Sequence, residues 1–123
     1  MQNNKLKFKD EFKKRTYRFA LEIIKLIDEM SRDKTCDIIG NQLLRSATSI
    51  GANVVEANAA SSKKEYTNFF SYALKSANET RFWLELLRDS GKAKKDLTDR
   101  LIAETVEIAN ILGASILTLR GKR

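Results

Sequence analysis

Apolar residues recur every three or four positions along nearly the whole chain, which is the spacing of one face of an α-helix. In the first such stretch, steps of 4, 3, 4, 3 and 4 residues lead from Phe12 to Met30. The chain contains no proline, the strongest helix breaker. Short polar segments divide the pattern, which therefore predicts four helices, over residues 8–31, 37–58, 62–90 and 96–120.

The connections between the predicted helices are only a few residues long, and short connections make successive helices antiparallel neighbours. We therefore expect an all-α fold, an antiparallel up-down-up-down four-helix bundle that forms one domain of residues 1–123. Gly40 and Gly51 lie inside the second helix, where each weakens an isolated helix by about 1 kcal/mol relative to alanine. Their presence predicts either a close approach to a neighbouring helix or a helix held by tertiary packing.

The predicted helix ends carry recognisable cap residues. Ser62 followed by Glu65 forms a capping box at the start of the third helix. Gly91 is placed to end that helix. Asp96 is the candidate N-cap of the fourth, and Cys36 is expected in the first connection.

The positive charge is concentrated at the two ends of the chain. The chain has 23 Lys and Arg against 16 Asp and Glu, for a net charge of +7. Residues 1–18 hold seven basic and two acidic residues, and residues 120–123 add three basic ones. An antiparallel bundle brings both termini and the second connection to one end, where we expect a basic cluster of Lys5, Lys7, Lys9, Lys63, Lys64, Arg120, Lys122 and Arg123.

The first helix adds a basic stripe, because four cations fall within about 20° of one another around its axis: Lys7, Lys14, Arg18 and Lys25. A clustered basic surface is typical of proteins that bind the phosphate backbone of a nucleic acid. The alternative is a solvated face with ion pairs along the helix, in which Glu11 pairs with Lys14 or Arg15 and Glu22 pairs with Arg18 or Lys25. Both interpretations remain open from the sequence.

A polar seam runs along the second helix beside its apolar face. Its members follow one another at steps of 4, 3, 4 and 3, with Arg45 alongside: Gln42, Ser46, Ser49, Asn53 and Glu56. Most of these side chains are short, so another helix can approach them. The seam predicts either an interface or hydrogen-bond network, such as a contact between subunits or the lining of a shared channel, or an ordinary solvated face. Glu56 and Glu79 are a conceivable acid–base or metal-binding pair, against the alternative that Arg45 or Arg81 pairs with Glu79.

Most enzyme chemistry is absent. Without histidine there is no Ser-His-Asp triad and no Glu-x-x-His di-metal motif. One cysteine permits neither an intrachain disulfide nor a cysteine cluster for metal, and the five glycines form no phosphate-binding loop. We expect no enzyme activity, no cofactor and no metal. The N-terminus lacks the apolar stretch of a signal peptide, and no membrane span is expected, so we predict a cytoplasmic protein.

Two segments resemble a known family. Residues 42–57, QLLRSATSIGANVVEA, resemble the QLxRSAxSIxxNIxE pattern of the bacterial four-helix bundle family, also called the 23S rRNA intervening-sequence protein family. The segments SKKEY at residues 62–66 and YALKSANETRFWL at residues 72–84 resemble the second half of the same signature. The sequence departs from one branch of the family at Ala57 and Lys75.

The resemblance implies a left-handed antiparallel bundle that assembles into a homopentameric ring. The family includes the accessory variability determinants of diversity-generating retroelements, which are basic scaffolds that bind nucleic acid and a reverse transcriptase. The matched residues would then serve the fold or the assembly rather than catalysis: Gln42, Arg45, Ser46, Ser49, Asn53, Glu56 and Glu79.

Two functions follow from these observations. The first is a small homo-oligomeric scaffold that binds RNA or DNA phosphates without sequence specificity, together with a protein partner such as a reverse transcriptase. The second is a purely structural or protein-interaction module whose charge serves solubility. Salt-sensitive binding to a polynucleotide distinguishes the two.

Overall fold

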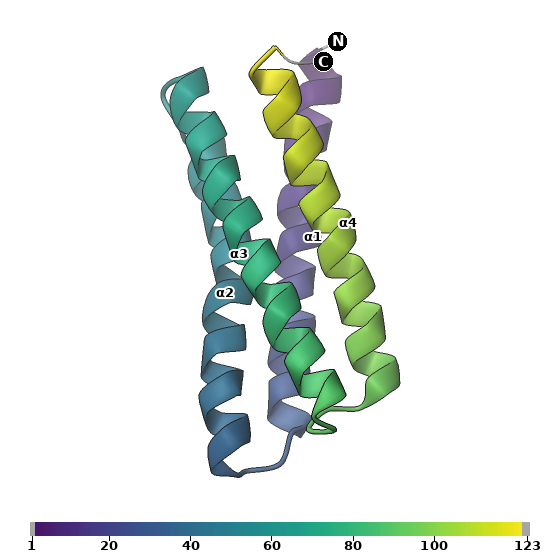
Figure 1. Ribbon diagram of the computed structural model, residues 1–123. Coiled ribbons are helices and arrows are strands. Elements are labelled where there is room, and N and C mark those ends of the chain that lie inside the picture. The colour runs from purple at the N-terminus through teal and green to yellow at the C-terminus, as the bar shows by residue number, and fades with distance from the viewer. Residues whose placement is uncertain (1, 122–123) are drawn as a thin grey trace.

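A computed structural model describes residues 2–121 of the chain, with side chains from residue 4 onward. It contains four α-helices: α1 (Gln2–Glu29), α2 (Lys34–Asn58), α3 (Lys63–Asp89) and α4 (Lys95–Leu119). The helices run alternately up and down, and each packs against its sequence neighbours (Figure 1). This confirms the predicted all-α, antiparallel bundle.

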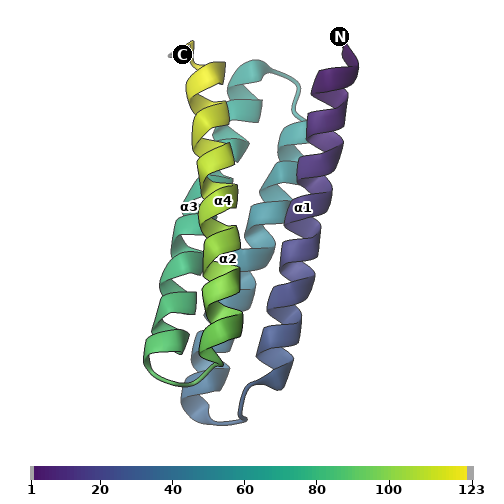
Figure 2. The same ribbon diagram turned by 90° about the vertical axis from the view of Figure 1, so that its right-hand side faces the viewer.

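The helices are arranged as two pairs, with α1 beside α2 on one side of the bundle and α3 beside α4 on the other (Figure 2). The most extensive packing joins α2 to α3, and the least extensive joins α1 to α4. The two termini and the α2–α3 connection lie at one end, as the topology predicts (Figure 1). We call this the basic end, because Lys5, Lys7, Lys63, Lys64 and Arg120 lie there.

The core consists of the apolar positions that recur every three or four residues. Its largest fully buried side chains include Phe19, Phe70, Leu43, Leu84 and Ile108. Gly51 lies against α1, because a Cβ there would be 3.5 Å from Thr16 Oγ1 and 3.7 Å from the Thr16 carbonyl oxygen. These are ordinary van der Waals distances; the tighter contact is at Gly40, where a Cβ would lie 3.3 Å from Met30 Cε.

Several helix ends differ from the predictions. The first helix begins at Gln2 rather than near residue 8. The second begins at Lys34, because the carboxylate of Asp33 caps it by accepting the Cys36 N–H at 2.8 Å. Cys36 is therefore a buried residue of the first turn and not part of a connection. The N-cap of α4 is Lys94, without a side-chain bond, so the prediction for Asp96 is wrong.

The ends of α3 agree with the predictions. Ser62 Oγ accepts the N–H of Glu65 at 3.1 Å, while Glu65 Oε1 accepts the N–H of Ser61 at 3.0 Å. At the other end Gly91 has φ of +74° and Lys92 donates its N–H to Leu87 O at 3.0 Å. This is the αL termination that glycine favours.

One helix of the described region, α4, has the length and apolar composition of a membrane span. Core helices pass the same test, but only 33% of the relevant 18-residue stretch is buried inside this bundle. Most exposed positions of α4 are nevertheless polar, and among the described residues of this helix Leu117 is the one large apolar side chain that is exposed, by 44%.

Candidate functional site

The basic end collects cations from three separate parts of the chain. Lys5 and Lys7 lie on the first turns of α1, Lys63 and Lys64 on the first turn of α3, and Arg120 at the C-cap of α4. All five side chains are exposed, and among the described residues none lies within salt-bridge distance of a carboxylate. Two further cations expected here, Lys122 and Arg123, lie outside the described residues.

Aromatic rings close the core beneath these cations. Phe8 stacks on Phe12 with ring centroids 5.6 Å apart, and Phe70 contacts both Phe12 and Tyr66. Lys9 Nζ lies 5.1 Å from the centroid of the Tyr66 ring, a cation–π contact that joins α1 to α3. Lys9 is therefore half-buried and serves the packing of the end, unlike its more exposed neighbours.

Some carboxylates near the basic end already have partners. The carboxylate of Asp10 accepts a bond from Lys14 Nζ at 3.1 Å. The carboxylate of Glu65 accepts bonds from the N–H and the hydroxyl of Ser61 at the start of α3. The remaining acidic groups nearby, Glu11 and Glu56, are exposed to solvent. The end therefore presents more free cations than free anions.

The basic stripe on α1 does not join the cluster as one patch. Lys25 is twenty residues beyond Lys5, which is about 30 Å along the helix axis. Lys14 pairs with Asp10 and not with Glu11. Glu22 accepts from Arg100 of α4 at 2.7 Å rather than pairing with Arg18 or Lys25.

Ion pairs between helices hold the bundle in register. Arg15 on α1 makes two bonds to Glu104 on α4, at 2.7 and 2.8 Å, and the hydrogen bond from this carboxylate raises the pKa of the guanidinium. Arg88 on α3 donates to Asp99 on α4 at 3.0 Å. Bonds from Lys95 and Arg88 lower the pKa of the Asp99 carboxyl. In each of these pairs the two residues belong to different helices, so the three- and four-residue spacing rule within one helix could not identify the pair.

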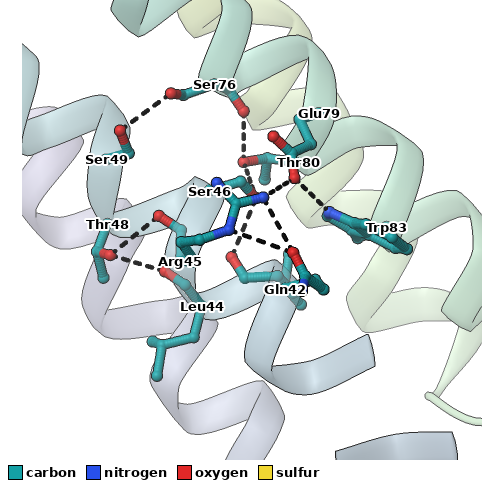
Figure 3. A network of polar contacts seen from close by, with 11 residues as sticks. Gln42, Leu44, Arg45, Ser46, Thr48, Ser49, Ser76, Glu79, Thr80 and Trp83 are labelled. Carbon is teal, nitrogen blue, oxygen red and sulfur yellow. Dashed lines mark hydrogen bonds and ion pairs between the residues drawn. The ribbon is translucent and has the colours of Figure 1, made fainter. Parts of the chain in front are cut away.

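The polar seam lies at the contact between α2 and α3 (Figure 3). Ser46 is fully buried, and Thr80 Oγ1 lies 2.9 Å from Ser46 Oγ and 2.8 Å from the Ser76 carbonyl oxygen. One turn away, Ser76 Oγ donates to Ser49 Oγ at 3.1 Å. The prediction of a solvated face is wrong for Ser46, whose buried hydroxyl belongs to a hydrogen-bond network between two helices of one subunit.

On the outer side of the seam, a cluster of four side chains joins the two helices (Figure 3). Arg45 donates to the carboxylate of Glu79 and also to Gln42 Oε1, at 3.0 Å from Nη2. The same Glu79 oxygen accepts the indole N–H of Trp83 at 3.0 Å. Arg45, rather than Arg81, is therefore the partner of Glu79, and Arg81 pairs with Glu85 at 3.2 Å.

Glu56 and Glu79 do not form a pair. The Ser46–Thr80 and Ser49–Ser76 contacts set the register of α2 against α3, and that register places Glu56 opposite residue 69. Ten residues of helix, about 15 Å, then separate it from Glu79. The structure gives no support to an acid–base or metal-binding pair of these carboxylates.

The remaining seam residue bonds within its own helix. Asn53 Nδ2 donates to the Ser49 carbonyl oxygen at 2.9 Å. The seam as a whole is an interhelical clasp, with Glu56 on the outer surface. Sequence reasoning missed Thr80 and Trp83 as members, although Trp83 follows Glu79 by four residues and so lies on the same face of α3.

Comparisons with known proteins agree with this architecture. Residues 9–114 match the model of a family described as 23S rRNA-intervening sequence protein. No curated protein matches. A crystal structure from Bacteroides thetaiotaomicron, of a protein with unknown function from the S23 ribosomal protein family, superposes with a TM-score of 0.82 at 33% sequence identity. The match covers 88% of this chain and 96% of that chain. The chain thus belongs to the 23S rRNA-intervening sequence protein family.

Proposed function

We propose that this protein is a self-associating helical scaffold that binds the phosphate backbone of RNA or DNA through its basic end. The observation that carries the proposal is the set of five exposed cations with no carboxylate partner among the described residues: Lys5, Lys7, Lys63, Lys64 and Arg120. They come from three helices, so the fold itself gathers them. Unpaired lysines and arginines on one surface supply the sequence-independent part of nucleic-acid affinity.

The first turns of α1 and α3 and the last turns of α2 and α4 meet at this end, so the helix dipoles offset one another and the positive charge comes from the side chains. The described part of the site has no groove-reading motif, which favours contact with phosphates over the reading of bases. Binding of this kind is weak for one subunit and strongly dependent on salt.

Self-association would multiply that weak contact. We propose a homopentameric ring, as the family resemblance implies, in which several basic ends engage one nucleic acid. Linked weak sites gain affinity from their effective concentration without any new contact.

The alternative function is a protein-interaction module, for which a reverse transcriptase is the partner class that the resemblance implies. The observation in its favour is the number of large apolar side chains left exposed, among them Tyr17, Tyr72 and Phe82. Such side chains serve assembly equally well. Binding measurements on the basic end separate the two functions.

The test compares the double variant Lys63→Ala/Lys64→Ala with a charge-matched control at the opposite end, Lys34→Ala/Lys94→Ala. Both pairs lie at helix starts and are exposed, so each variant loses two positive charges without touching the core. Affinity for a labelled 20-nucleotide RNA is measured by fluorescence anisotropy at low salt. We expect a loss of about tenfold in the first variant and a much smaller loss in the control. Equal losses, or no binding by the wild type, would contradict the proposal.

A further inference from the structure

A row of aromatic rings joins α1 to α3 just inside the basic end. Phe8 stacks on Phe12 with ring centroids 5.6 Å apart and an angle of 11° between the ring planes. Phe12 contacts Phe70 at 6.0 Å, and Phe70 contacts Tyr66 at 4.8 Å. Phe8 and Tyr66 are the members of this row nearest the end, because each precedes its buried neighbour by about one helical turn.

Phe8 is the ring of this row that solvent reaches most. Phe12 and Phe70 are buried, and Tyr66 is half-buried beneath Lys9, whose Nζ lies 5.1 Å from the ring centroid. Phe8 remains 38% exposed. One face of its ring packs on Phe12, and side chains of an α-helix lean toward the N-terminus of the helix. The open side of the Phe8 ring therefore faces the basic end.

Cations lie beside the open side of this ring. Lys5 precedes Phe8 by three residues, which places both on one face of α1. Lys63 precedes Tyr66 by three residues of α3, about 4.5 Å along that helix axis. The carboxylate on the same face of α1, Glu11, lies one turn further from the end than Phe8. A strand whose phosphates contact these cations would therefore pass close to the Phe8 ring.

We infer that Phe8 is a stacking platform for one base of a single-stranded nucleic acid whose phosphates lie on the cations of the basic end. An aromatic face beside a basic surface binds single strands without reading sequence, because every base has a π-face. The bases of a duplex are stacked on one another and do not reach the ring. The inference rests on the proposed phosphate binding and names the class of nucleic acid that this site takes.

Leucine is the substitution that isolates stacking from packing. Phe8→Leu keeps an apolar side chain over Phe12 and a good helix former in α1, but it removes the flat aromatic face. Phe82→Leu is the matched control, because Phe82 is 55% exposed and lies nineteen residues beyond Lys63, about 28 Å along α3. Both variants therefore lose one exposed phenyl ring, at opposite ends of the bundle.

Three labelled DNA probes separate base stacking from phosphate binding. They are a 20-nucleotide thymidine strand, an abasic strand with the same number of phosphates, and a duplex of 20 base pairs. Affinities are measured by fluorescence anisotropy at one low salt concentration. Circular dichroism and light scattering check that each variant keeps the fold and the molar mass of the wild type.

We expect the wild type to bind the thymidine strand about fivefold more tightly than the abasic strand, or more, which corresponds to one stacked base. Phe8→Leu should remove this difference by weakening the binding of the thymidine strand alone. Its affinity for the duplex and for the abasic strand should equal that of the wild type. Phe82→Leu should leave all three affinities unchanged.

Three results would overturn the inference while leaving phosphate binding intact. The first is equal affinity of the wild type for the thymidine and abasic strands. The second is a loss in Phe8→Leu that is the same for both strands or is shared by Phe82→Leu. The third is an altered molar mass of Phe8→Leu, which would place the ring in a contact between subunits. A wild type that binds none of the probes would overturn the proposed function as well.

Phe8→Trp gives a second readout that does not depend on a loss of binding. A base stacked on the introduced indole should quench its fluorescence, whereas Trp83, the one tryptophan of the chain, lies twenty residues beyond Lys63. We expect the thymidine strand to quench the emission of Phe8→Trp and not that of the wild type. Absent quenching, or equal quenching by the abasic strand, would contradict stacking at this position even if Phe8→Leu failed to fold.

Discussion

The buried hydroxyl pair of Ser46 and Thr80 gives a quantitative test of how α2 and α3 are joined. Both side chains are fully buried, and their oxygens are 2.9 Å apart. Ser46 Oγ also bonds the Leu43 carbonyl oxygen at 3.2 Å, and Thr80 Oγ1 bonds that of Ser76 at 2.8 Å. Removing either hydroxyl therefore breaks the interhelical bond but leaves the other hydroxyl with a partner.

The magnitude follows from the loss of one buried hydrogen bond, which is about 1 kcal/mol. Ser46→Ala and Thr80→Val should each lower the free energy of unfolding by about that amount, with a shift in midpoint temperature of about 4 °C. The double variant loses the same bond only once. Its cost should therefore fall short of the sum of the two single costs by about 1 kcal/mol.

Urea unfolding followed by circular dichroism measures this coupling. All four proteins are compared at one protomer concentration, because self-association shifts the apparent stability. Strictly additive single and double costs would refute the assignment of a direct Ser46–Thr80 bond, and with it the account of the seam as an intramolecular clasp.

Further predictions concern the helix ends and one ion pair. Gly91→Ala should cost about 1 kcal/mol, because φ of +74° is unfavourable for a residue with a Cβ, and Gly91→Asn should cost less; thermal unfolding measures both. The bond from the Cys36 N–H, followed by smaller contributions that include Lys92, lowers the pKa of the Asp33 carboxyl. The ionised Asp33 carboxylate therefore stabilises the folded state above about pH 4, and this stabilisation is lost as the pH falls through the lower pKa of the folded state. Unfolding of Asp33→Asn compared at pH 6 and pH 3 should show a smaller acid-induced loss than the wild type. Arg15→Ala should lower the free energy of unfolding by about 1 kcal/mol through its two bonds to Glu104, and Arg15→Lys should restore only part of it, as urea unfolding would show.

The four helices and their order were predictable, because apolar residues recur every three or four positions along the sequence. The same local information identified the cap at Ser62 and the stop at Gly91. It placed the start of α2 too late, at residue 37, because the apolar spacing does not extend to the cap residue Asp33. It gave Asp96 a capping role because aspartate is a common N-cap, although α4 begins without a side-chain cap.

The candidate site was predictable only in part. Topology alone brings Lys5, Lys63 and Arg120 to one end, and this placement is confirmed. Partner choice was not predictable, because Glu22 can bond a cation of its own helix or Arg100 of α4, and tertiary packing favours the latter. Ser46 belongs to the polar seam by spacing, yet α3 covers it, which depends on the angle at which the two helices meet.

The salt dependence of polynucleotide binding shows directly whether the basic end contacts phosphates. If the five unpaired cations of a basic end each neutralise one phosphate, each engaged subunit should contribute about −3.5 to the slope of log K against log salt for single-stranded RNA. Lys63→Ala/Lys64→Ala should reduce the magnitude of the slope by about 1.4 per engaged subunit, and Lys34→Ala/Lys94→Ala should leave it unchanged. A slope near zero, or the same slope in all three proteins, would contradict a phosphate-binding role for the basic end.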